Sequence, residues 1–116
     1  MATGSEVQLA LEAAQQLRHD GTAVRVVSMP SHEWFDAQPA DYRDSVLPSH
    51  IRARVSVEAG SAMSWHRYLG TDGRAVSLEH FGASADYKRL YQEFGITADA
   101  VVAAARESIR AAKGEQ

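Results

Sequence analysis

Short stretches rich in β-branched residues alternate along this chain with longer stretches whose apolar residues recur at helical spacing. The first helical stretch follows Gly4, and its apolar face consists of Val7, Ala10, Leu11, Ala14 and Leu17. Arg18 and His19 suit the last turn of this helix, and Gly21 suits the left-handed residue that follows it. The next stretch, 22–29, is rich in β-branched residues and predicts a strand.

Two short helices are predicted in the long connection that follows this strand. The first begins after Ser31 and the second near Asp41, and both residues are typical N-caps. A short strand then includes Val55 and Val57 and ends at Gly60.

The rest of the chain continues the alternation of helix and strand. A short helix is predicted over 63–70, and a third strand over 75–82 follows a turn at 71–74. Another helix is predicted over 86–95. Thr97 caps the last predicted helix, whose apolar stripe is Val101, Val102, Ala105 and Ile109. Strands that alternate with helices predict an α/β fold with a mostly parallel sheet and helices on both faces.

The size and charge of the chain limit its possible classes. A length of 116 residues is that of one domain, which we assign to residues 1–116. The formal net charge of -3, with both signs interspersed, favours neither nucleic acid nor a membrane surface as a partner. No apolar run approaches the roughly 18 residues that cross a bilayer, so we expect a soluble, cytoplasmic protein. Cysteine is absent, which excludes disulfides, thiolate nucleophiles and zinc–thiolate sites.

The segment 3–6 lies where a phosphate-binding loop would precede the first helix. A dinucleotide fingerprint needs three glycines and a P-loop needs a lysine after its second glycine, whereas Gly4 stands alone. Ser5 and Gln8 instead match a capping box, in which each side chain bonds to the main chain of the other residue. We therefore expect Ser5 to cap the helix, with weak anion binding at the helix N-terminus as the alternative.

Polar residues at the carboxyl ends of the predicted strands form the candidate site, because ligands bind at this edge of an open parallel sheet. The candidate rim consists of Ser5, Ser31, Glu58, Glu79 and His80. If its side chains converge, they form with His32 an acid–base or metal cluster. Alternatively, the two glutamates are held by main-chain amides, hydroxyl groups or an arginine at an interface. None of the five histidines has the spacing of a metal site.

Eight short motifs occur in the order and at the spacing found in a known family. They are ATGSEV, VRVVSMPS, WFDAQ, YRDSVLP, VEAG, a tryptophan followed by YLG, FGASA and EFGIT. With these motifs the chain resembles the C-terminal domain of transketolase, from Ala2 to about Ala112. The resemblance implies a three-layer α/β/α fold whose mixed sheet has parallel strands and one antiparallel edge strand.

Transketolases transfer a two-carbon ketol unit between sugar phosphates with thiamine diphosphate and a divalent metal. The resemblance places cofactor and substrate between two other domains, and it gives this domain a structural role that supports the dimer. It implies no catalytic, cofactor-binding or metal-binding residue in this chain, because the diphosphate motif Gly-Asp-Gly is absent. The implied partners are the other domains of the same enzyme, in a homo-oligomer of the pentose phosphate pathway. The alternative is a stand-alone small-molecule-binding or regulatory module that uses the rim.

The resemblance also carries an expectation about the N-terminal end. In the family, the segment that matches ATGSE ends a long apolar strand inside the sheet, between the strands that match 24–29 and 55–58. Only residues 1–3 of that strand are present here, and the antiparallel edge strand before it is missing. Unpaired main-chain groups inside a sheet are costly. We therefore expect the isolated chain to be a dimer or larger, or to be marginally folded.

Overall fold

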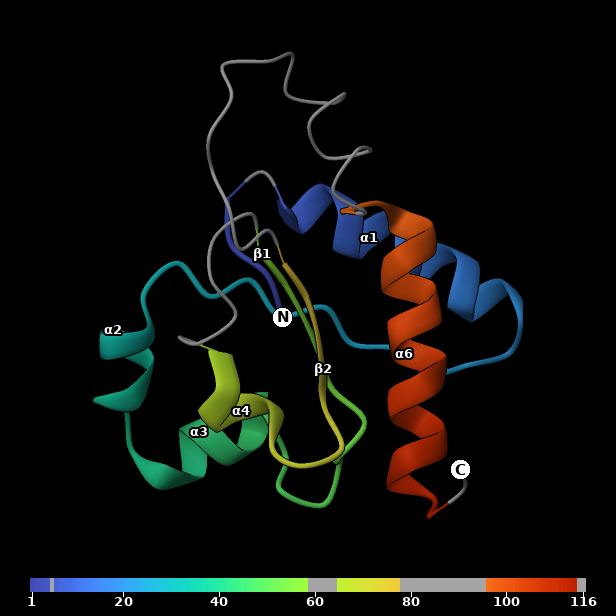
Figure 1. Ribbon diagram of the computed structural model, residues 1–116. Coiled ribbons are helices and arrows are strands. Elements are labelled where there is room, and N and C mark those ends of the chain that lie inside the picture. Colours follow the sequence, from blue (N-terminus) through green and yellow to red (C-terminus); the bar gives the residue numbers. More distant parts are fainter. Residues whose placement is uncertain (5, 59–64, 78–95, 115–116) are drawn as a thin grey trace.

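The computed structural model describes residues 1–4, 6–58, 65–77 and 96–114, and Figure 1 shows how their elements are arranged. The helices are α1 (Glu6–His19), α2 (His32–Asp36), α3 (Ala40–Val46), α4 (His66–Leu69) and α6 (Ala98–Ala112). The strands are β1 (Val55–Glu58) and β2 (Arg74–Ser77). Each of these elements lies where the sequence pattern predicts a helix or a strand.

A parallel sheet lies at the centre of the described structure. β1 and β2 pair in parallel along their whole length. On the other side of β1, Ala2 forms parallel bridges with Val57 of β1 and with Ser28. The N-terminal residues therefore lie inside the sheet, between the segment 24–29 and β1, as the resemblance implied.

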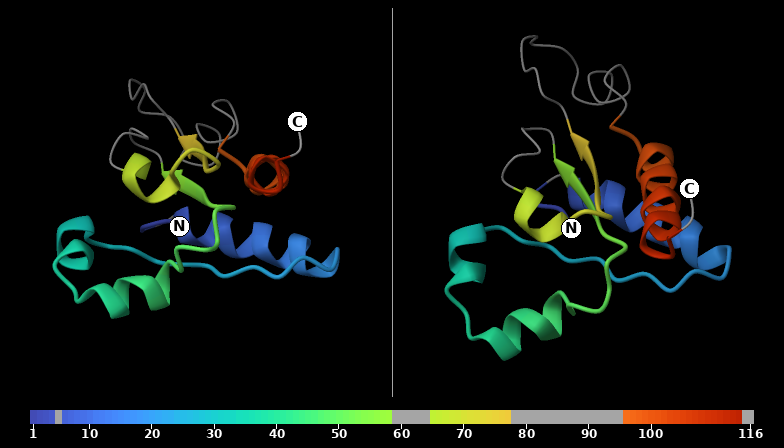
Figure 2. Two further views of the ribbon diagram at one scale, coloured as in Figure 1. Left: turned by 90° about the horizontal axis from the view of Figure 1, so that it is seen from below. Right: turned by 60° about the horizontal axis from the view of Figure 1, so that its bottom comes forward.

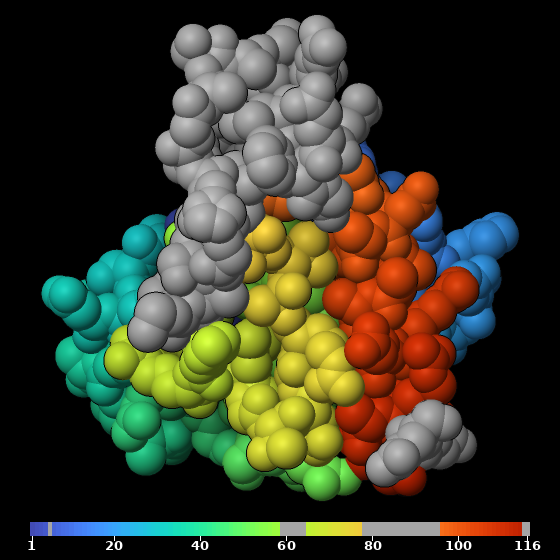
Figure 3. All heavy atoms as spheres, viewed as in Figure 1, coloured from blue at the N-terminus to red at the C-terminus, as the bar shows by residue number. Residues whose placement is uncertain are grey.

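Helices cover both faces of this sheet. The left panel of Figure 2 shows α1 and α6 on one face and α2, α3 and α4 on the other. In the view of Figure 3, α4, β2 and α6 form adjoining parts of one surface. The predicted α/β fold, with a parallel sheet between two helical layers, is confirmed.

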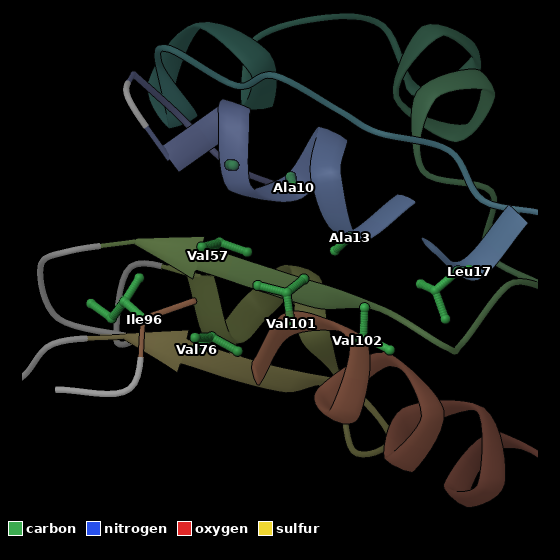
Figure 4. Packing of buried hydrophobic residues seen from close by; sticks show 9 residues of the cluster. Ala10, Ala13, Leu17, Val57, Val76, Ile96, Val101 and Val102 are labelled. Atoms are coloured by element: carbon green, nitrogen blue, oxygen red, sulfur yellow. The ribbon is translucent and has the colours of Figure 1, made fainter. Parts of the chain in front are cut away.

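The first hydrophobic core lies between the sheet and the pair α1 and α6. Its buried side chains in Figure 4 include Ala10, Ala13, Leu17, Val57, Val76, Ile96, Val101 and Val102. The alanines of α1 recur at helical spacing, so the helix approaches the sheet closely along that face. α6 begins as predicted, because Oγ1 of Thr97 accepts a hydrogen bond of 3.1 Å from the main-chain N–H of Ala100.

The second hydrophobic core lies on the opposite face of the sheet, under α2 and α4. Its buried side chains are Met29, Phe35, Trp65, Tyr68 and Leu69. The last three come from α4 and the residue before it. Two separate cores therefore hold the sheet, one for each helical layer.

The caps of the two short helices differ in how well the sequence predicted them. Ser31 is the N-cap of α2, as expected. The prediction that Asp41 caps α3 is wrong, because α3 begins after Pro39 and has no side-chain cap. Oδ1 of Asp41 accepts a hydrogen bond from the N–H of the next residue, Tyr42, inside the helix. Pro39 is the N-cap instead, and its main-chain oxygen accepts a hydrogen bond of 3.0 Å from Arg43 N–H.

The predicted strand over 22–29 is only partly formed. In the described part of the chain, Ser28 is the residue of this segment that bridges to another strand, and residues 22–27 belong to no strand. A strand needs hydrogen bonds from a neighbouring strand, and a cavity lies beside 22–27 instead.

Two further predictions extend beyond the described residues. The third strand, predicted over 75–82, is described as β2 up to Ser77. The rest of that strand and the helix predicted over 86–95 lie outside the described residues.

Candidate functional site

The structure describes two residues of the candidate rim, Ser31 and Glu58. The other three, which lie outside the described residues, are Ser5, Glu79 and His80. Oγ of Ser31 accepts a hydrogen bond of 3.1 Å from the main-chain N–H of Trp34. This hydroxyl oxygen is therefore engaged in starting α2.

Glu58 ends β1 beside the indole ring of Trp65. The indole N–H of Trp65 donates a hydrogen bond to Oε2 of Glu58. Because the Trp65 side chain is fully buried, this bond satisfies its one polar group. The carboxylate at the end of β1 thus holds the first residue of the α4 region in place.

Four aromatic side chains pack together next to this pair, and we call them the aromatic cluster: His32, Phe35, Trp65 and Tyr68. His32 contacts Trp65 edge to face, with ring centroids 4.3 Å apart, and Tyr68 at 5.2 Å. Phe35 meets Tyr68 edge to face at 5.9 Å. Such contacts contribute about 0.5–1.5 kcal/mol each beyond the burial of area. The cluster therefore joins α2 to α4.

A polar chain borders the aromatic cluster. The hydroxyl of Tyr68 donates to Oδ1 of Asp36 at 2.8 Å, and Oδ2 of Asp36 pairs with Nη2 of Arg67 at 2.5 Å. Burial raises the pKa of Tyr68, with the hydrogen bond from Arg67 opposing that rise, so the hydroxyl is a donor at neutral pH. The Arg67 side chain is 58% exposed, so its ion pair adds little to stability.

Arg54 is a second link between α4 and the connection that follows α3. Its guanidinium donates to the main-chain oxygens of Tyr68 at 2.7 Å, Pro48 at 2.8 Å and Leu47 at 3.2 Å. Sequence reasoning missed this role, because an arginine that binds main-chain oxygens leaves no motif. The pairing of Asp36 with Tyr68 was missed as well, because 32 residues separate the two.

The side chains described above connect elements of the fold to one another. Among the described residues, no group of three or more histidine, aspartate or glutamate side chains lies close enough to hold a metal ion. Every buried side-chain nitrogen or oxygen in the described ranges has a hydrogen-bond partner. No helix formed by these residues is both long and apolar enough to cross a bilayer. The described part of the rim therefore offers no orphaned polar atom for a ligand.

The N-terminal ammonium group lies inside the protein on the other side of β1. It donates a hydrogen bond of 2.7 Å to the main-chain oxygen of Val55. Burial lowers its pKa from an ordinary value of 8.0 to about 6. It borders a cavity, and the other charged residues that line this cavity are Arg25 and Arg54.

This buried amine predicts a pH-dependent stability. Its pKa is lower in the folded state, so the unfolded chain binds more protons between pH 6 and pH 8. The free energy of unfolding should therefore rise by about 2–3 kcal/mol across that window and be lowest below pH 6. Urea unfolding at pH 5 to 9 measures this rise.

Acetylation of the N-terminus provides the control for this measurement. The acetylated chain keeps every histidine and lysine but has no N-terminal amine to protonate, so the difference between the two pH profiles isolates that amine. If the two profiles run parallel, the amine is solvated rather than buried.

A family model described as the transketolase-like C-terminal domain matches residues 1–97 of this chain. The chain belongs to this family. The transketolase of Mycobacterium leprae is 57% identical over 107 residues, which are 92% of this chain and 15% of that protein. The transketolase of Mycobacterium tuberculosis is 55% identical over 109 residues, 94% of this chain and 16% of that protein. This transketolase-like domain thus spans about a sixth of the length of the curated relatives it matches.

Solved transketolase structures share the fold of this transketolase-like domain. The transketolase from Leishmania mexicana matches with a TM-score of 0.84 and 47% identity, over 94% of this chain and 16% of that one. A Pichia stipitis transketolase in complex with sedoheptulose-7-phosphate matches with a TM-score of 0.83 and 33% identity, over 99% of this chain and 16% of that one. These matches confirm the resemblance and the fold class that the motifs indicated.

Proposed function

We propose that this transketolase-like domain is the C-terminal domain of a transketolase, an enzyme that transfers a two-carbon ketol unit between sugar phosphates. The observation that carries this proposal is the 57% identity to a transketolase over 92% of the chain. The domain has a non-catalytic role: it packs against the other domains of the same enzyme and supports a homodimer. The enzyme acts in the cytoplasm, in the pentose phosphate pathway.

Two features of the structure support a non-catalytic role. The described rim groups are used within the domain, since Ser31 caps α2 and Glu58 binds Trp65. Large apolar side chains are also exposed on the surface, as expected of a domain that packs against others. They are Leu11, Trp34, Tyr42 and Ile51.

Thiamine diphosphate and a divalent metal are the cofactors that the whole enzyme would use. The residues of this chain do not fit them, because the sequence lacks the Gly-Asp-Gly motif. The described residues also hold no cluster of metal-binding side chains. The other domains of the enzyme would therefore supply the binding site.

The isolated chain is expected to show no ketol transfer and no saturable binding of thiamine diphosphate in the presence of Mg²⁺. The physical reason is that a lone helix N-terminus is a weak anion site without a metal or basic residues beside it. Isothermal titration calorimetry at micromolar cofactor and a ketol-transfer assay measure the two quantities. Saturable cofactor binding would contradict the proposal, and a saturable thermal shift with a sugar phosphate would favour a binding module.

A domain exchange tests the supporting role directly. In the transketolase of Mycobacterium tuberculosis, the segment that matches this chain is either deleted or replaced by residues 1–116. Deletion should lower both the dimer fraction in sedimentation and the ketol-transfer rate, and the replacement should restore both. A deletion that keeps full dimerisation and activity would rule out the supporting role.

A further inference from the structure

A cavity of about 340 Å³ lies where α2, α3 and α4 meet, and we call it the helix pocket. The three helices lie together at the lower left of Figure 1. The lining side chains include Phe35 and Asp36 from α2, Arg43 and Asp44 from α3, and Arg67 and Tyr68 from α4. Pockets that bind small molecules measure roughly 300–1,000 Å³, so the helix pocket has room for a small metabolite.

One wall of the helix pocket is apolar. It is formed by Phe35, Leu47 and the ring of Tyr68. Phe35 and Tyr68 are buried and meet edge to face, with ring centroids 5.9 Å apart, and Leu47 is half-buried beside them. This wall would therefore take an apolar group of a ligand.

The charged lining of the helix pocket consists of three arginines and two aspartates, so its net charge is positive by one. Two of these five side chains are fully engaged within the domain. Arg54 binds the main-chain oxygens of Leu47, Pro48, Ile51 and Tyr68. Asp36 accepts from Tyr68 through one oxygen and pairs with Arg67 through the other. Charged groups for a ligand must therefore come from the remaining side chains.

Arg43 offers the clearest free group of the helix pocket. Its Nε donates to the main-chain oxygen of Gln38 at 3.0 Å, which orients the guanidinium. Neither of its Nη groups has a partner among the described residues. A guanidinium held in this way presents a fork of N–H donors, which matches the two oxygens of a carboxylate.

Asp44, the next residue of α3, offers a free group of the opposite charge. Its Oδ1 accepts a hydrogen bond of 3.0 Å from the main-chain N–H of Ser49, and its Oδ2 has no hydrogen-bond partner in the described part of the chain. None of the ion pairs formed by described residues joins Arg43 to Asp44. The helix pocket thus holds a free donor fork and a free acceptor on adjacent residues.

We propose that the helix pocket binds a free α-amino acid with an apolar side chain. The carboxylate of this ligand accepts from the Nη groups of Arg43, and its ammonium group donates to Oδ2 of Asp44. Its side chain packs against Phe35 and Leu47. These three contacts use the free donor, the free acceptor and the apolar wall together.

A phosphate ester is a poorer occupant of the helix pocket. It carries between one and two negative charges at neutral pH, and the net charge of the lining is positive by one only. It also has no donor for Oδ2 of Asp44, so that carboxylate would repel it.

Binding of the amino acid would also anchor α3. This helix has seven residues and no buried side chain, so its own contacts hold it weakly. A ligand held by Arg43 and Asp44 and packed on Phe35 would connect α3 to α2. Hydrogen exchange of the main-chain amides of 40–46 should therefore become slower when the ligand binds.

The test uses L-leucine and two analogues that each lack one of its charges. Near-UV circular dichroism first establishes that the aromatic cluster is packed. Calorimetry at pH 7 should then show one-to-one binding of L-leucine with a dissociation constant of about 1 mM or below. Leucinamide lacks the carboxylate and 4-methylpentanoate lacks the ammonium group, so each should bind about tenfold more weakly. Inorganic phosphate should not compete with L-leucine.

Three variants of α3 locate the two charged contacts. Arg43→Gln should weaken binding of L-leucine about tenfold and make its affinity equal to that of leucinamide. Asp44→Asn keeps the acceptor for Ser49 N–H, and it should make the affinities of L-leucine and 4-methylpentanoate equal. Asp41→Asn is the matched control, because it removes the same charge from the same helix outside the helix pocket, and it should leave binding unchanged.

Two results would overturn the proposal: absence of saturable binding of L-leucine, or equal affinity of all three variants for it. Competition by inorganic phosphate would also overturn it, because the helix pocket would then be a simple anion site. Equal affinity of L-leucine and leucinamide for the unaltered chain would rule out the carboxylate contact with Arg43.

Discussion

Replacement of Trp65 by alanine should lower the free energy of unfolding by about 3–5 kcal/mol. The Trp65 side chain is fully buried and is the largest such side chain among the described residues. It contacts His32 and Tyr68 edge to face, and its N–H donates to Glu58. The substitution leaves a cavity in the second core and removes the donor from the glutamate. The free energy of unfolding of small domains is about 5–15 kcal/mol in total, so urea unfolding should show that the variant is only marginally stable.

Trp34 provides the matched control for this experiment. It is the other tryptophan of the chain and is 63% exposed. Its main-chain N–H binds Ser31, and this bond persists when the side chain is shortened. Trp34→Ala should therefore change the free energy of unfolding by no more than about 0.5 kcal/mol. If the two variants lose similar stability, Trp65 is not the centre of the second core.

The long helices were the most predictable part of this fold, because their signals are local. The helix stop at Arg18 and His19 marks the end of α1, and the cap at Thr97 marks the start of α6. In an α-helix, both the apolar spacing and the capping hydrogen bonds connect residues that are three or four positions apart. A short window of sequence is therefore enough to predict where such a helix begins and ends.

Strand pairing was less predictable, because it depends on residues far away in the sequence. The β-branched composition of 22–29 predicts a strand, yet only Ser28 bridges to another strand among the described residues. The composition of a segment shows whether it favours an extended conformation. The strands that lie beside it in the fold determine whether it forms a hydrogen-bonded strand. β1 shows the converse, because Arg74 and the residues after it supply the partner that it needs.

The rim was predictable as a location but not as a set of contacts. The carboxyl ends of parallel strands are fixed by topology, which is why Ser31 and Glu58 were singled out. Their partners come from elements whose position only the fold defines. The indole N–H of Trp65 reaches Glu58 because Trp65, the N-cap of α4, lies beside the end of β1. The residues that support the rim were therefore visible in the sequence only as separate aromatic and acidic positions.

Ser108 is the clearest example of a role that the sequence concealed. It lies in α6, one residue before the predicted apolar position Ile109, and its side chain is fully buried. Its Oγ accepts a hydrogen bond of 3.0 Å from the main-chain N–H of Arg54 and donates one of 2.6 Å to the main-chain oxygen of Asp72. One hydroxyl thus joins α6 to the residues that lead into β1 and β2.

Ser108→Ala should lower the free energy of unfolding by about 1–3 kcal/mol, because it leaves the main-chain N–H of Arg54 without a partner, whereas Asp72 O keeps its hydrogen bond from Nη1 of Arg74. Ser45→Ala is the matched control: the Ser45 hydroxyl donates to Tyr42 O at 2.6 Å at an exposed position, where water replaces it. That change should cost no more than about 0.5 kcal/mol. Urea unfolding compares the two variants, and hydrogen exchange should become faster at Arg54 N–H in the first alone. Equal stability losses would mean that water enters beside α6 and satisfies the Arg54 N–H, so that α6 would be held to the sheet by its apolar contacts.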